Sequence, residues 1–93
     1  MRLKEQEIAK IRDIIVKYFG KSQIYIFGSR LKENVQGGDI DIFVIPKERK
    51  NLFTKSSKAK FFLENILLKP IDILVHQDFS QEIEQIAIQG IKI

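Results

Sequence analysis

The sequence contains no cysteine and no tryptophan, and only one histidine and two prolines among its 93 residues. The lack of cysteine agrees with a reducing compartment, and the charged stretch at residues 1–7 leads into a helical pattern rather than into the apolar core of a signal peptide. We therefore expect a cytoplasmic protein. No uninterrupted apolar run approaches the roughly 18 residues of a spanning helix, so we expect no membrane association.

Two glycine-rich nucleotide-binding motifs are also missing. The chain has no Gly-x-Gly-x-x-Gly of the dinucleotide-binding folds and no Walker A loop ending in Lys-Ser or Lys-Thr. The composition is that of an ordinary globular protein, with 44% apolar and 30% charged residues. A chain of this length supports one hydrophobic core, so we predict a single domain over residues 1–93.

The net charge of +4 is concentrated in a central basic window. Its members are Lys47, Arg49, Lys50, Lys55, Lys58 and Lys60. We interpret most of this window as the solvated face of a helix. A basic nucleic-acid binder is a weaker hypothesis, because aromatic residues are not interleaved with these lysines in the way that stacking on bases requires.

Hydrophobic periodicity divides the chain into helices and strands. Helical spacing covers residues 4–19 and 51–67, and a tail helix is predicted from Phe79 to Gly90. Short β-branched or aromatic runs predict strands, which are 22–27, 39–45, 71–75 and a final edge strand at 91–93.

Two details of this pattern bear on topology. The intervening loop, residues 29–38, is too short for a helical crossover, so strands 22–27 and 39–45 should be antiparallel. The tail helix is expected to be capped by Asp78 with Gln81 closing a capping box. Phe79, Ile83, Ile86 and Ala87 lie on one apolar stripe of this predicted helix. The order α-β-turn-β-α-β-α predicts an α/β (α+β) fold, a small mixed β-sheet flanked by helices.

Acidic residues interrupt two of the predicted strands. Asp39 and Asp41 alternate with isoleucines and therefore point to the same face. Adjacent carboxylates repel each other, and a divalent cation such as Mg²⁺ relieves the repulsion. Asp72 lies between two isoleucines in the third strand, and if that strand pairs beside the second, it becomes a third ligand. Three acids of this kind can hold two metal ions for phosphoryl transfer.

A Gly-Ser-Arg turn follows the first strand. Gly28 lets the backbone approach a ligand closely. Ser29 offers an N–H and a hydroxyl to a phosphate oxygen, and Arg30 can add a charge-assisted hydrogen bond. His76, which follows the third strand on the same alternation phase as Asp72, is interpreted as a loop residue rather than a catalytic one.

With these residues the chain resembles the DNA polymerase beta-like nucleotidyltransferase superfamily, in particular its minimal nucleotidyltransferase (MNT) branch. The family signature is a strand ending in Gly-Ser, a loop of about ten residues, Asp-x-Asp in the next strand and a third acid in a later strand. Here Gly28-Ser29, Asp39-Ile40-Asp41 and Asp72 occupy those positions. Between Leu31 and Gly38 the chain departs from the family pattern.

The resemblance implies a nucleotidyltransferase fold and a two-metal mechanism. In that mechanism Ser29 holds the triphosphate, and Asp39, Asp41 and Asp72 bind magnesium. It further implies transfer of AMP from ATP to a hydroxyl acceptor. Minimal members act as antitoxins of HEPN ribonuclease toxins, so a HEPN-domain protein is the expected partner. An alternative from another class is a catalytically inactive module that neutralises a partner by occlusion, and homo- or hetero-oligomers are left open.

Overall fold

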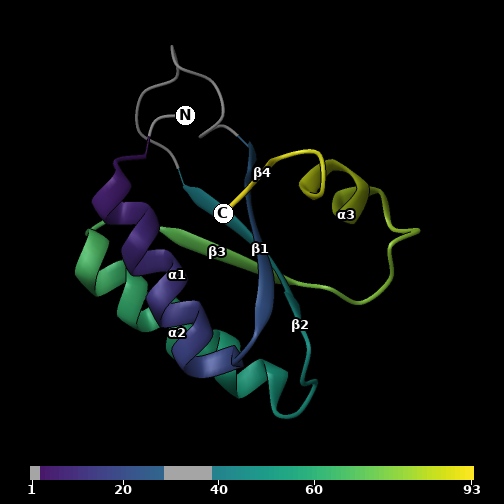
Figure 1. Ribbon diagram of the computed structural model, residues 1–93, viewed down its shortest axis with the longest axis horizontal. Coiled ribbons are helices and arrows are strands. Elements are labelled where there is room, and N and C mark those ends of the chain that lie inside the picture. Colours follow the sequence, from purple (N-terminus) through teal and green to yellow (C-terminus); the bar gives the residue numbers. More distant parts are fainter. Residues whose placement is uncertain (1–2, 29–38) are drawn as a thin grey trace.

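The structure, a computed structural model, describes residues 3–28 and 39–93 (Figure 1). Helices and strands alternate along these residues much as the periodicity predicts. Their bounds are α1 Glu5–Phe19, β1 Ser22–Phe27, β2 Ile40–Pro46, α2 Leu52–Leu67, β3 Ile71–Val75, α3 Glu82–Ala87 and β4 Ile91–Lys92. The predicted fold class, a small mixed sheet flanked by helices, is confirmed.

The four strands of the described residues form one sheet in the order β3-β2-β1-β4. β1 pairs antiparallel with β2, as the short loop between them predicts, and it also pairs antiparallel with β4. β2 and β3 are parallel, because α2 provides the crossover that a parallel pair needs. At the start of this pair the Ile40 N–H donates to the Pro70 carbonyl oxygen at 3.0 Å.

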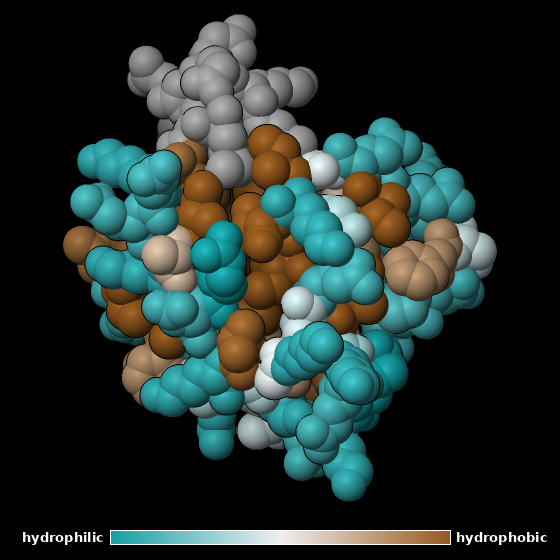
Figure 2. Space-filling model, in the orientation of Figure 1, coloured by the Kyte–Doolittle hydropathy of each residue, from teal (hydrophilic) through white to brown (hydrophobic). Residues whose placement is uncertain are grey.

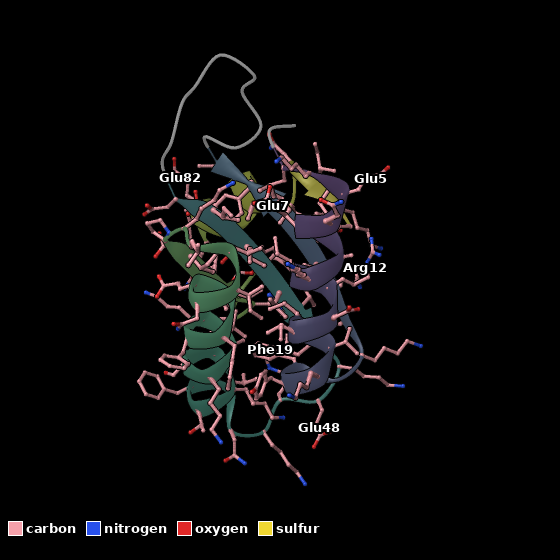
Figure 3. The ribbon with its side chains drawn as sticks, turned by 90° about the vertical axis from the view of Figure 1, so that its left-hand side faces the viewer. Glu5, Glu7, Arg12, Phe19, Glu48 and Glu82 are labelled. Atoms are coloured by element: carbon pink, nitrogen blue, oxygen red, sulfur yellow. The ribbon has the colours of Figure 1, made fainter. Side chains whose placement is uncertain are left out.

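The ends of α1 are held by specific contacts. Gly20 has φ +75 and its N–H donates to the Val16 carbonyl oxygen at 2.8 Å, which ends the helix. At the other end Glu7 accepts the Lys4 N–H at 3.0 Å and the Lys69 ammonium at 2.8 Å. Glu7, labelled in Figure 3, therefore ties α1 to the turn that follows α2.

The sheet has one covered and one partly covered face. α1 and α2 lie side by side on one face, and α3 lies on the other (Figures 1 and 3). The face under α1 and α2 carries the main core. Its buried residues include Ile11, Ile15, Phe19, Ile24, Ile26, Ile40, Ile42, Val44, Ala59, Leu63 and Ile71. On the opposite face a smaller cluster contains Phe27, Phe43 and Ala87.

Two predictions for the tail helix are wrong. α3 begins at Glu82 rather than Phe79, because Asp78 Oδ1 accepts the Ser80 N–H at 2.9 Å and the Ser80 hydroxyl at 2.8 Å, which closes a local turn instead of capping a helix. Of the apolar stripe, Ala87 is buried, whereas Phe79, Ile83 and Ile86 are about half exposed. The other buried residue of α3 is Glu84.

Hydrophobic side chains also reach the surface. Figure 2 shows a band of them along the strands between α1 and α3. Two phenylalanines of α2, Phe53 and Phe61, are 85% and 61% exposed, so they do not belong to the core. Within the described ranges no helix is long and apolar enough to cross a membrane.

Candidate active site

Three acids meet where β2 and β3 begin. Asp41 of β2 and Asp72 of β3 are directly opposite each other in the parallel register. Asp39 immediately precedes β2 and shares the face of Asp41 by strand alternation. The structure therefore brings together the three acids that the sequence singled out, on the sheet face that carries α3.

Neighbouring acids shift the pKa values of Asp41 and Asp72. Desolvation, and then the charges of Asp72 and Asp39, raise the pKa of Asp41. Desolvation and the adjacent Asp39 carboxyl raise the pKa of Asp72, while Lys60, whose ammonium lies 4.0 Å from Asp72 Oδ1, acts in the opposite direction. Asp39 thus makes both Asp41 and Asp72 harder to ionise, and Asp72 does the same to Asp41, which is a condition that a bound cation reverses.

Gly28 brings the backbone of β1 beside the acids. Its predecessor Phe27 pairs with Asp41, and Gly28 itself has φ +79, in the left-handed region that favours glycine. A Cβ at this position would overlap Oδ2 of Asp41. Glycine is therefore favoured here by its conformation, and a Cβ would in addition push the Asp41 carboxylate aside. Ser29 and Arg30, the other predicted phosphate-binding residues, lie outside the described residues, so their contacts stay predictions.

A cleft of about 500 Å³ adjoins the acids, within the range of roughly 300–1,000 Å³ typical of small-molecule sites. Its lining residues are Phe27, Gly28, Asp41, Asp72, Ile73, Leu74, Ile83 and Ile86. The apolar contribution of α3 to this cleft was not predicted. Ile83 and Ile86 match a helical stripe, but the stripe alone does not say whether it packs on a core or lines a site.

The donor set suits a hard divalent cation. Magnesium binds one or two carboxylates together with phosphate oxygens and water. In residues 3–28 and 39–93, however, no three Asp, Glu, His or Cys side chains already converge as a metal-binding group. A cation shared by Asp39, Asp41 and Asp72 therefore requires their side-chain torsions to change, and the attraction of the three carboxylates to the cation would offset their mutual repulsion.

His76 is not among the residues that line the cleft. Its Nδ1 lies 2.6 Å from Oε1 of Glu84, and its ring stacks on Phe79 with centroids 3.9 Å apart. That His76 is not catalytic stays a prediction, and its hydrogen bond to a buried glutamate was not foreseen.

Comparison with known proteins gives one family match in agreement with this geometry. The model of the family described as "Nucleotidyltransferase domain" matches residues 8–93. The matched range contains Gly28, the three acids and each strand of the described sheet. None of the curated proteins compared with the chain matches it.

Proposed function

From the premise that the chain belongs to the nucleotidyltransferase domain family, whose activity is nucleotidyl transfer, we propose that it transfers AMP from ATP to a hydroxyl acceptor with the help of Mg²⁺. The observation that carries the proposal is the direct pairing of Asp41 with Asp72, beside a glycine that leaves room for the carboxylate. Asp39 lies close enough to both acids to raise their pKa values.

The proposed reaction is a substitution at the α-phosphorus of the nucleotide. The acceptor oxygen bonds that phosphorus, the bond to the oxygen that bridges to the β-phosphate breaks, and pyrophosphate leaves with the bridging oxygen. The hydroxyl proton passes to solvent. Magnesium neutralises phosphate charge and activates the nucleophile in reactions of this class.

Each predicted residue has a role in this scheme. Asp39, Asp41 and Asp72 would hold the magnesium ions, which balance their charges. Gly28 lets the chain turn beside the acids, and Ser29 with Arg30 would bind the phosphates of the donor.

Labelled ATP tests the activity. The protein is incubated with Mg²⁺, ATP labelled at the α-phosphate and a candidate acceptor protein, and transfer of label is measured. Asp39→Asn should abolish transfer, whereas Glu48→Gln, an exposed change in the connection between β2 and α2, should leave it intact. Transfer that is unaffected by Asp39→Asn would contradict the proposal.

The biological role that we propose is that of an antitoxin which modifies a HEPN ribonuclease. The support is the spacing from Gly28-Ser29 through Asp41 to Asp72, which is similar to that of the minimal branch of the superfamily. Co-expression of the chain with a HEPN protein encoded beside it measures this role as rescue of growth.

Occlusion without catalysis is the second candidate, and exposed aromatic residues on α2 favour it. Phe61 is 61% exposed and packs edge-on against Phe62, which in turn stacks on Tyr18 of α1. Such a patch is suited to a protein contact. Full rescue by the Asp39→Asn, Asp41→Asn double variant would favour occlusion, whereas loss of rescue in a folded variant that still binds would favour catalysis.

A further inference from the structure

Glu84 of α3 is a buried charge that the proposed chemistry does not use. Its side chain is fully buried, the one buried charged residue in the part of the chain that the structure describes. Oε2 accepts the N–H groups of Gln77 at 2.6 Å and Asp78 at 3.0 Å, and Oε1 lies 2.6 Å from His76 Nδ1. Glu84 therefore binds residues 76–78, the first half of the connection between β3 and α3.

The carboxylate of Glu84 is ionised at neutral pH. Burial opposes the charge, but the hydrogen bonds from His76, Gln77 and Asp78 outweigh it and lower the pKa of Glu84. An ionised carboxylate can only accept, so the proton of the contact belongs to His76 Nδ1. Removal of these donors would leave a buried charge without partners, which makes the arrangement specific rather than incidental.

His76 is in turn fixed to the sheet. The backbone N–H of His76 donates to the Val44 carbonyl oxygen at 2.9 Å. The Arg49 guanidinium donates to the carbonyl oxygen of His76. Its ring is stacked on Phe79 and lies edge-on to Phe43, with centroids 6.4 Å apart. Glu84 thus connects α3 to a residue that does not move independently of β2.

α3 needs such a tether. It has six residues, and a helix of that length is unstable by itself. Past its C-terminal end Gly90 lies so close to the Ile26 carbonyl oxygen that a Cβ would not fit, which fixes the exit of the chain. Glu84 fixes the connection that leads into the helix. Between these two points Ile83 and Ile86 line the cleft that Asp41 and Asp72 share.

We infer that Glu84, through its hydrogen bonds to His76 and the following backbone, is a positioning residue that holds the Ile83 and Ile86 wall of the cleft opposite the acids. The inference rests on the proposed function, because it assigns the cleft to the nucleotide donor. Loss of the tether lets α3 move away from the sheet and weakens nucleotide binding, while the acids on β2 and β3 keep their places.

Binding of α,β-methylene-ATP with Mg²⁺ tests the inference, because the bond that transfer would break is replaced in this analogue. Glu84→Gln keeps the size of the side chain but presents an amide that cannot accept from all three donors. We expect it to weaken binding at least about tenfold, since unpaired buried donors are costly. Glu82→Gln, an exposed change in the first turn of the same helix and labelled in Figure 3, should bind like the parent.

A second readout separates positioning from general loss of structure. Mn²⁺ broadening of NMR signals near Asp41 and Asp72 should be the same in Glu84→Gln and the parent. If Glu84→Gln does not fold, His76→Gln replaces it, since that change leaves the two backbone hydrogen bonds of Glu84, and weaker nucleotide binding is again expected.

Two results would overturn the inference, and they are distinguishable. Unchanged nucleotide binding in a folded Glu84 or His76 variant, with a lower melting temperature, would show that Glu84 is structural only and would leave the proposed function intact. Failure of the parent protein to bind the analogue would refute the proposed function and the positioning role together.

Discussion

The two faces of the sheet differ in polarity and in how far they are covered. Under α1 and α2, Ile26, Ile40 and Ile42 are fully buried in a continuous hydrophobic core. On the face of α3, Phe43 is buried, but the end of the sheet nearest Gly28 carries Asp41 and Asp72 in an open cleft. One face is apolar and closed, while the other combines acids whose pKa values are raised with a short helix held by a buried glutamate.

This difference separates stability from function within one strand. In β2, Ile40 and Ile42 contribute to the core, and Asp41 between them points to the cleft. Burial of an isoleucine side chain contributes about 1.5–3 kcal/mol, whereas clustered carboxylates reduce stability until a cation binds. Substitutions on the two faces should therefore affect different measurements.

The largest expected effect is on catalysis. The Asp41→Asn, Asp72→Asn double variant should lose about a thousandfold in the rate of nucleotidyl transfer, because magnesium stabilisation worth several kcal/mol depends on these carboxylates. Its melting temperature without magnesium should rise, since the repulsion that raises the pKa of both acids is removed. A variant that keeps its transfer rate, or that melts earlier than the parent, would contradict the assignment of this face.

A matched pair of isoleucines tests the closed face against the open one. Ile42→Ala should reduce the free energy of unfolding by about 2–5 kcal/mol, because Ile42 is fully buried. Ile86→Ala should reduce it by less than about 1 kcal/mol, because Ile86 is half exposed. Urea unfolding measures both, and equal losses would show that α3 belongs to the stability core after all.

Two glycines at positive φ provide the next comparison. Gly20→Ala and Gly28→Ala should each cost about 1–2 kcal/mol of stability from the left-handed conformation. A Cβ at Gly20 meets nothing within 4 Å, but at Gly28 it displaces the Asp41 carboxylate. Only Gly28→Ala should therefore lose transfer activity, and an inactive Gly20→Ala would mean that strain rather than the contact with Asp41 is responsible.

The smallest expected effect is on the pH dependence of stability. The contributions of Asp41 in the cleft and of Glu84 in α3 should change with pH in opposite directions. The raised pKa of Asp41 means that the folded state holds its proton more tightly than the unfolded state, so this acid reduces stability as pH rises through that interval. The lowered pKa of Glu84 has the reverse effect, a contribution present above the unfolded value and lost as pH falls through the folded one.

Unfolding free energies measured from acidic to neutral pH test this pair. Asp41→Asn should stabilise the protein most near neutral pH and least in acid, whereas the loss caused by Glu84→Gln should be greatest near neutral pH and shrink in acid. Saturating Mg²⁺ should remove the advantage of Asp41→Asn. If both variants showed the same pH dependence, the electrostatic contrast between the acids and Glu84 would be wrong.

Local patterns predicted most of the elements of this fold. The spacing of Ile11 and Ile15 predicted α1, and the short loop before Asp39 predicted the antiparallel pairing of β1 with β2. Both depend on interactions between residues close in sequence. The position of Asp72 beside Asp41 was predicted only on the condition that β3 pairs with β2, and the structure supplies that pairing.

The tail helix shows where local patterns fail. Asp78 is a residue type that often caps helices, but its carboxylate accepts the Ser80 N–H and closes a turn. The helix therefore starts at Glu82, later than predicted. From the sequence Glu84 would be expected to be exposed to solvent, since glutamate is rarely buried unless it is paired. Its burial depends on His76 and two backbone N–H groups that become available only when β3 and its following turn lie against the sheet.

Short segments of the sequence are enough to predict the alternation of helices and strands and to single out the three acids, because periodicity and side-chain chemistry are local properties. Membership of the nucleotidyltransferase domain family is also a matter of sequence. The position of Asp72 beside Asp41, the contact that a Cβ at Gly28 would make with the Asp41 carboxylate and the burial of Glu84 appear only in the folded structure. These depend on strand register and on contacts between distant segments, which the folded chain alone creates.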